Sequence, residues 1–156
     1  IISCLNEKSS GVLLCLGDPS IFASSSYILR KIKELDPRIN IKKLPGISSI
    51  SAAAAYADYD LVKQGEILKI IECPNDSSQL IDLINKAAAN NIVLAILKVG
   101  KRWPWVKEIL EKEKVLNKAI LAINIGMQNQ FIENACLYTS DEIPYFSLLI
   151  IRINQS

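Results

Sequence analysis

The chain has 156 residues, half of them hydrophobic, and a formal net charge of +2 at pH 7. This length can bury a core and suits one domain or two small ones. The apolar runs fall short of the roughly 18 residues of a membrane span, no secretory signal is visible, and no basic tract is concentrated enough for a dedicated nucleic-acid binder. We therefore expect neither a membrane nor a nucleic acid as partner.

The cysteines argue against a metal site. None of the four forms a C-x-x-C pair, and the chain has no histidine, so a zinc site is close to excluded. Cys15 and Cys136 lie in apolar runs, which predicts buried, reduced thiols. Reduced thiols are typical of the cytoplasm, where we expect this protein to be located.

The first part of the chain alternates strand-like and helix-like patterns. Residues 11–17 and 39–46 are predicted to be strands, because they are apolar and rich in branched side chains. Residues 22–36 form a predicted helix, because apolar residues recur there at spacings of four and three, and 48–57 form an alanine-rich one. This order predicts an α/β fold in which helices cover a parallel sheet.

A break in the pattern at residues 58–65 suggests a boundary between a partial N-terminal α/β domain, 1–62, and a C-terminal α/β domain, 63–156. Beyond it, helices are predicted at 77–91 and 103–116, and strands at 66–73, 92–100, 118–126, 131–138 and 144–154. The later strands favour antiparallel pairing. We therefore expect two separate sheets, the first parallel and the second mixed.

Three sharp loops follow predicted strands, at residues 17–22, 45–49 and 98–102. Ligands of open α/β sheets bind beyond the carboxyl ends of the strands, so we expect these loops to converge on one cleft. In the first loop, Asp18 places a carboxylate beside free backbone amides and could take a cationic partner. Each loop by itself also fits an ordinary turn that connects a strand to a helix.

The common catalytic motifs are missing from the sequence. It contains neither G-x-x-x-x-G-K-[ST] nor G-x-G-x-x-G, so phosphate and dinucleotide loops have no support. Without histidine, a serine or cysteine triad of the usual kind is disfavoured. If the protein is an enzyme, its reaction should need little proton transfer by side chains. Group transfer from an already activated donor meets this condition, because positioning the reactants then supplies most of the rate acceleration.

Five segments, LGDPSIFASS, LPGISSISAAAA, ILKVGKRWPWVKEIL, IGMQNQ and PYFSLLIIR, occur in an order that resembles the tetrapyrrole methyltransferases of cobalamin biosynthesis. The KVG and PYFSL segments resemble the branch that methylates precorrin-2 at C-20. The resemblance implies a two-domain tetrapyrrole methylase fold with S-adenosylmethionine held between the domains. It also implies methyl transfer from a sulfonium to an electron-rich ring carbon, with S-adenosylhomocysteine as product.

The resemblance assigns cofactor contacts residue by residue but assigns no catalytic residue. The implied cofactor-binding residues are Leu16, Gly17, Asp18, Ile21, Ser48, Ser49, Val99, Gly126, Met127 and Tyr145. Lys98, Lys101 and Arg102 are the basic residues nearest the predicted cleft, so they are candidates for the carboxylates of the substrate. The alternative for these three is the solvated start of a helix.

The family begins with a strand and a glycine–proline-rich loop that nothing before residue 11 matches. We therefore expect the first sheet to be truncated and residues 1–156 alone to bind S-adenosylhomocysteine weakly and to be inactive. Members usually form homodimers, and an open sheet edge favours self-association. Two alternatives stay open: a methyltransferase for another tetrapyrrole position or acceptor, and a noncatalytic α/β binding module. Whether the substrate carries cobalt also stays open.

Overall fold

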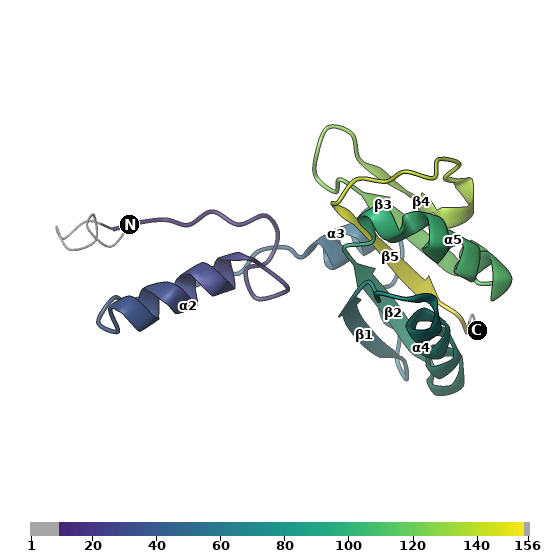
Figure 1. Cartoon of the computed structure of the whole chain (residues 1–156), viewed down its shortest axis with the longest axis horizontal. Coiled ribbons are helices and arrows are strands. Elements are labelled where there is room, and N and C mark those ends of the chain that lie inside the picture. The colour runs from purple at the N-terminus through teal and green to yellow at the C-terminus, as the bar shows by residue number, and fades with distance from the viewer. Residues whose placement is uncertain (1–9, 155–156) are drawn as a thin grey trace. The chain divides into compact units, whose positions relative to one another are not determined.

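A computed structural model of the chain describes residues 10–154 (Figure 1). The chain forms two compact units, which divide between Ser49 and Ile50. The domain boundary expected after residue 62 stays a prediction.

In the first unit, helix α2 (Ser25–Leu35) is the regular element of the described residues. It ends at Asp36, whose backbone turns extended while its N–H donates to the Ile32 carbonyl. Pro37 follows and cannot continue a helix. The helix therefore forms where the apolar spacing predicts it.

The two strands predicted in the first unit are not formed. Residues 11–17 and 39–46 have no strand assignment, and Val12 and Leu14 are 85% and 89% exposed. A strand is stable only when a neighbour satisfies its backbone groups and covers one face. Neither segment has such a neighbour in the described residues, so apolar composition alone does not make them strands.

The second unit contains one sheet flanked by helices. Its elements are α3 (Ser49–Tyr56, which starts at the boundary), β1 (Ile67–Glu72), α4 (Ser77–Asn90), β2 (Ile92–Leu97), α5 (Trp103–Lys112), β3 (Ala119–Ile123), β4 (Phe131–Asn134) and β5 (Ser147–Arg152). Short 3₁₀ turns lie at Gly100–Arg102, Leu116–Lys118 and Ala135–Leu137. The helices start where the sequence indicates: Asp76 caps α4 by accepting a hydrogen bond from the Gln79 N–H, and a proline stands in the first turn of α5.

The five strands are ordered β1-β2-β5-β3-β4. β1 and β2 are parallel, whereas β5 pairs antiparallel with both β2 and β3, and β4 pairs antiparallel with β3. The α/β class and the mixed sheet are therefore confirmed. The expectation of two sheets is not met, because the described residues contain this one sheet only.

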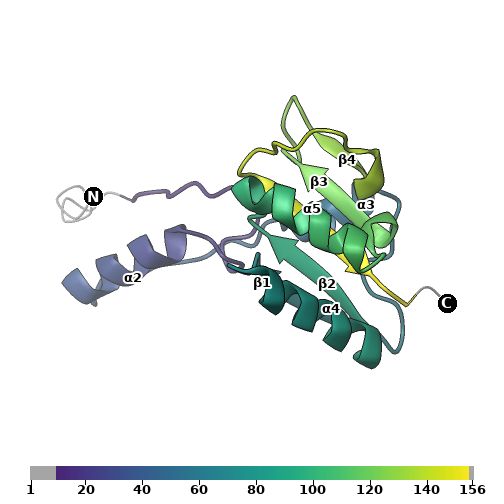
Figure 2. The ribbon, with the colours of Figure 1, turned by 45° about the vertical axis from the view of Figure 1, so that its right-hand side comes forward.

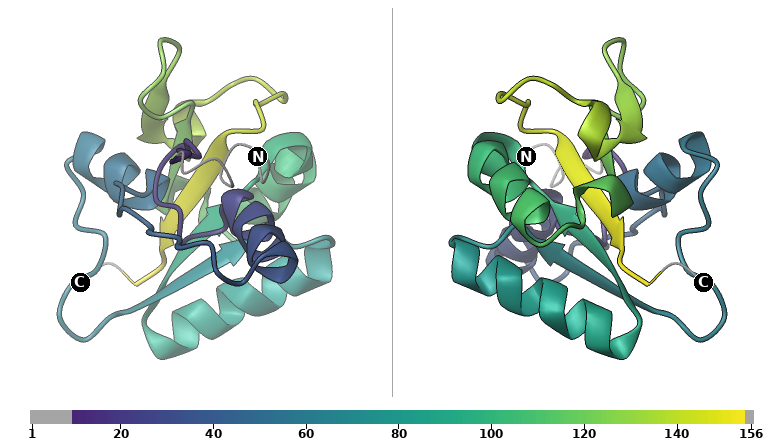
Figure 3. Two further views of the ribbon diagram at one scale, coloured as in Figure 1. Left: turned by 90° about the vertical axis from the view of Figure 1, so that its left-hand side faces the viewer. Right: turned by 90° about the vertical axis from the view of Figure 1, so that its right-hand side faces the viewer.

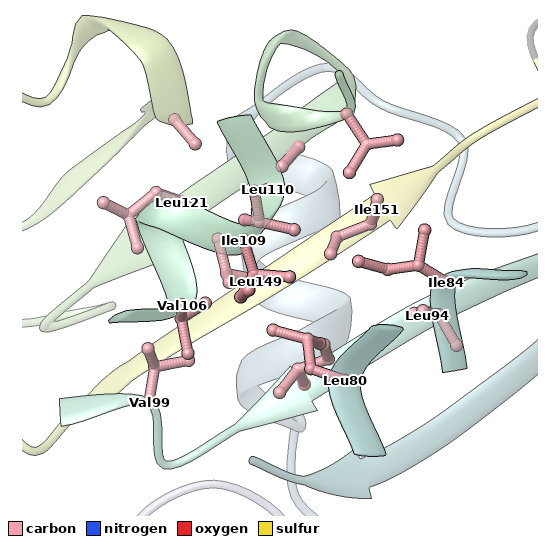
Figure 4. Packing of buried hydrophobic residues seen from close by; sticks show 14 of the residues in the cluster. Leu80, Ile84, Leu94, Val99, Val106, Ile109, Leu110, Leu121, Leu149 and Ile151 are labelled. Atoms are coloured by element: carbon pink, nitrogen blue, oxygen red, sulfur yellow. The ribbon is translucent and has the colours of Figure 1, made fainter. Parts of the chain in front are cut away.

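The sheet is covered on both faces. Figure 2 shows α4 and α5 in front of it, and Figure 3 shows α3 on the other side. Towards α4 and α5, alternate residues of β2 and β5 such as Leu94 and Leu149 pack against Leu80 and Leu110 of the helices (Figure 4). Towards α3 lie the intervening residues, including the buried Ile150. No helix of the described residues is long and apolar enough to cross a membrane.

Substituting Leu149→Ala should destabilise the protein by about 2–5 kcal/mol, because it leaves a cavity beneath the helices. Leu137→Ala removes the same atoms from a side chain that is 61% exposed, so it should change the free energy of unfolding by less than about 0.5 kcal/mol. Urea unfolding followed by circular dichroism measures both values. Similar values for the two variants would contradict the described core.

Candidate functional site

The candidate site of the second unit is the edge of the sheet where β1, β2 and β3 end. Because β2 and β3 are both antiparallel to β5, they run in the same direction, and their carboxyl ends lie beside the start of β5. Three loops therefore meet at this edge: 98–102, 124–130 and 144–147. Open α/β sheets bind ligands at such an edge.

Hydrogen bonds accepted by Ser147, the first residue of β5, join two of these loops. The Val99 N–H donates to the Ser147 carbonyl at 3.3 Å, and the Gly100 N–H donates to its Oγ at 2.9 Å. The Ser147 hydroxyl in turn donates to the Pro144 carbonyl at 2.8 Å. The third loop is joined through the Asn124 N–H, which donates to the Phe146 carbonyl at 2.8 Å. The edge is thus a connected backbone framework.

The backbone favours a glycine at the centre of this framework. Gly100 has φ +43°, in the left-handed region that other residues rarely adopt, although a Cβ there would meet the Tyr145 Cα only at an ordinary contact distance of 3.6 Å. The segment before Tyr145 is in turn fixed to α5, because the buried Trp103 donates from Nε1 to the Ser140 carbonyl at 3.0 Å. The helix and the edge loop therefore hold each other in place.

The structure brings Val99, Gly126, Met127 and Tyr145 to this one edge, and their role as cofactor contacts stays a prediction. Their side chains differ in what they offer a ligand. Val99 belongs to the core and is fully buried, whereas Met127 and Tyr145 are exposed. Sequence reasoning missed Ser147; its signal was a lone hydroxyl at the start of an otherwise apolar strand.

The three basic candidates lie at the end of β2 and the start of α5. Lys98 forms an ion pair with Glu72, and the Arg102 guanidinium donates to Asn75 Oδ1 at 2.8 Å. Lys101 is exposed. Side chains at and just beyond the end of β1 thus orient Lys98 and Arg102: the Glu72 carboxylate balances the charge of Lys98, whereas Asn75 leaves that of Arg102 unbalanced.

The cysteines differ from the sequence prediction. Cys15 and Cys136 are exposed rather than buried: Cys15 lies in a segment that forms neither strand nor helix, and Cys136 lies in a short 3₁₀ turn of which only Ala135 is buried. Cys73 is buried beyond β1, and desolvation raises the pKa of its thiol to about 11 although Arg102 opposes the shift. A thiol with that pKa is a poor nucleophile at neutral pH. Cys4 lies outside the described residues.

In the first unit, Asp18 joins two of the predicted loops. Its carboxylate accepts hydrogen bonds from the Ser20 hydroxyl, from the Ser20 N–H at 2.7 Å and from the Gly46 N–H at 3.3 Å. Hydrogen bonds from Ser20, then those from Gly46 and the charge of Lys43, hold the pKa of Asp18 below its usual value despite partial desolvation. Asp18 is therefore a carboxylate at neutral pH.

Glycine is also required where these two loops touch. A Cβ on Gly46 would collide with the Gly17 carbonyl, and Gly17 itself has φ +76°. The loops 17–22 and 45–49 are thus neighbours, as predicted, whereas 98–102 belongs to the second unit. Of the remaining candidates here, Leu16 and Ser49 are exposed, and Ile21 and Ser48 are half-buried.

These residues offer contacts rather than proton transfer. The described residues contain no group of three or more cysteine, aspartate or glutamate side chains that could hold a metal ion. In the first unit they supply an ionised carboxylate and serine hydroxyls, which can contact an ammonium group or hydroxyls. In the second unit they supply backbone N–H groups and the exposed Tyr145 ring, which can contact hydrogen-bond acceptors and an apolar ring.

Replacing Ser20 by alanine should raise the pKa of Asp18 towards its ordinary value, because the hydroxyl bond is the largest cause of the lowered pKa. NMR titration of the Asp18 carboxyl carbon measures the shift. Ser26→Ala removes a hydroxyl that donates to the Ala23 carbonyl instead and should leave the Asp18 titration unchanged. An unaltered Asp18 pKa in Ser20→Ala would contradict the described loop.

Comparison of the sequence with known proteins identifies its family. The family described as Tetrapyrrole (Corrin/Porphyrin) Methylases matches residues 1–139. A precorrin-2 C(20)-methyltransferase from Sinorhizobium sp is 24% identical over 139 residues, which make up 89% of this chain and 54% of that relative. The chain thus spans about half the length of this curated relative.

Solved structures show the same fold. A cobalt precorrin-4 methyltransferase of cobalamin biosynthesis has a TM-score of 0.68 at 16% identity, covering 96% of this chain and 66% of that one. The uroporphyrin-III C-methyltransferase from Thermus thermophilus, complexed with S-adenyl homocysteine, has a TM-score of 0.54 at 16% identity, covering 87% and 60%. From the family match over most of its length, the chain belongs to the tetrapyrrole (corrin/porphyrin) methylases.

Proposed function

We propose that the protein takes part in the S-adenosylmethionine-dependent C-methylation of precorrin-2, or of its cobalt form, at C-20 in cobalamin biosynthesis. The observation that carries this proposal is the framework around Ser147, which brings the predicted cofactor residues of the second unit to one sheet edge within a tetrapyrrole methylase chain. The Sinorhizobium relative, named for precorrin-2 C(20) methylation, supports the substrate. The reducing cytoplasm is the proposed location, consistent with the free thiols.

The residues fit S-adenosylmethionine, which supplies a methyl group already activated as a sulfonium. The Asp18 carboxylate can accept hydrogen bonds from an amino group, and the hydroxyls of Ser48 and Ser49 can pair with polar groups of the cofactor. The exposed Tyr145 ring and Met127 offer an apolar surface to a purine. The Thermus thermophilus structure with S-adenyl homocysteine supports this cofactor class.

The chain's own residues would act by binding and orientation. Lys98, Lys101 and Arg102 would attract the carboxylates of a tetrapyrrole, and their positions at the end of β2 would turn one face of the ring towards the edge. Positioning of this kind suffices for an acceptor carbon that is electron-rich. It requires no histidine and no reactive thiol, in agreement with the composition and with the raised pKa of Cys73.

Titration with S-adenosylhomocysteine tests the cofactor site. NMR detects even weak binding, and we expect saturable shifts of the Gly100, Met127 and Ser147 amides with little change in α4. Tyr145→Ala should weaken binding about three- to tenfold, because a stacking surface is lost. Tyr56→Ala removes another exposed tyrosine and should bind like the wild type. Shifts that are absent, or scattered over the chain, would contradict the proposed function.

We also propose that the protein is a homodimer. The exposed apolar side chains of Val12, Leu14 and Leu16 support this, because soluble proteins seldom leave such a run uncovered. Leu14→Lys should shift the molar mass measured by light scattering towards the monomer, whereas Leu137→Lys should not. A monomeric wild-type protein at high concentration would refute the dimer.

A further inference from the structure

A buried ion pair lies on the sheet face that α3 covers, apart from the candidate site. Arg152 is the last residue of β5 and pairs with Val93 of β2. Strand alternation directs it away from α4 and α5, because its neighbour Ile151 packs in the core on their side. Its partner Glu66 immediately precedes β1, and both side chains are 7% exposed.

Arg152 holds several groups of the segment that connects α3 to β1. Its Nε lies 2.7 Å from Glu66 Oε1, and its Nη2 donates to Glu66 Oε2 at 3.0 Å and to the Asp60 carbonyl. The guanidinium carbon lies 4.5 Å from the centre of the Tyr59 ring. Glu66 also accepts a hydrogen bond from the Lys63 N–H at 2.7 Å. The guanidinium thus contacts three residues of segment 57–66 and holds this segment against the sheet.

The same segment is fixed to α3 at its other end. The Tyr59 N–H donates to the Ala54 carbonyl at 2.9 Å, and the Ala57 N–H donates to the Ala53 carbonyl at 3.0 Å. A continuous chain of contacts therefore runs from β5 through Arg152 and Tyr59 to the end of α3. α3 has eight residues, and its buried side chains are one isoleucine and two alanines. So short a helix with so small an apolar face needs further tertiary contacts to stay in place.

We propose that Arg152 and Glu66 are positioning residues, which hold α3 on the sheet and thereby fix its first turn, which carries the proposed cofactor contact Ser49. This inference rests on the proposed function, because Ser49 matters only as a cofactor contact. Because both charges are buried, replacing either residue alone should loosen α3. Removing one partner leaves the other as an uncompensated buried charge, which destabilises far more than the loss of a surface pair.

Hydrogen exchange of the whole chain measures how firmly α3 is held. In Glu66→Gln, exchange in residues 50–66 should accelerate on the order of a hundredfold. Arg152→Lys keeps the charge but loses the planar guanidinium, so it should accelerate exchange in the same residues by a smaller factor. This variant provides the test if Glu66→Gln does not fold. Tyr59→Phe retains the ring and should exchange like the wild type.

The matched control is Asp82→Asn, which breaks the exposed ion pair with Lys86 on α4. Its exchange should change less than about threefold anywhere, because exposed pairs contribute little. Unchanged exchange in residues 50–66 of a folded Glu66→Gln or Arg152→Lys variant would overturn the inference.

Titration of the Arg152→Lys variant with S-adenosylhomocysteine separates positioning from general stability. We expect the Ser49 amide to lose its response at ligand concentrations where Gly100 and Met127 still respond as in the wild type. A Ser49 response equal to that of the wild type would overturn the positioning role while leaving the proposed function intact. A wild-type protein without any response would overturn the proposed function, whereas the exchange experiment would still decide whether Arg152 anchors α3.

Discussion

The structure of the second unit depends on the insertion of β5 between β2 and β3. All six residues of β5 are buried, so this strand is covered on both faces and paired at both edges. A strand in that position must be apolar throughout, and SLLIIR is apolar apart from its two ends. The polar residues at its two ends connect the strand to other parts of the unit. Ser147 connects the ligand-edge loops at one end, and Arg152 anchors the α3 connection at the other.

The sequence predicts strands and helices best where an apolar pattern coincides with actual burial or with a signal for the start of a helix. β2 and β5 were predicted from continuous apolar runs, and α4 and α5 from apolar periodicity with a polar or proline start. Residues 11–17 carry an equally apolar pattern but form no strand, because pairing is a property of the neighbour and cannot be read from one segment. Cys136 shows the same limit: its apolar context forms a short turn in which only Ala135 is buried.

The candidate site was predictable in part for a related reason. Glycines and prolines mark where strands stop, so the sequence indicated the loops at Gly17, Gly46 and Gly100. It could not indicate which side chains join one loop to another. The contacts of Asp18 with Gly46, and of Ser147 with Gly100, span 28 and 47 residues. The contact of Ser147 with Gly100 depends on strand order, because the order β1-β2-β5-β3-β4 places the last strand of the chain in the middle of the sheet.

At this edge of the sheet, the residue after β2 and the residue after β3 both have a left-handed backbone conformation. Lys98, after β2, has φ +58°, and Asn124, after β3, has φ +51°. Asparagine tolerates this left-handed region, whereas lysine rarely adopts it, and the ion pair of Lys98 with Glu72 helps to hold it there. Because strained residues persist only where surrounding contacts determine them, the two turns show that the edge is shaped by the sheet around it. A ligand bound there would meet a preformed backbone, which is the requirement of a reaction that depends on positioning.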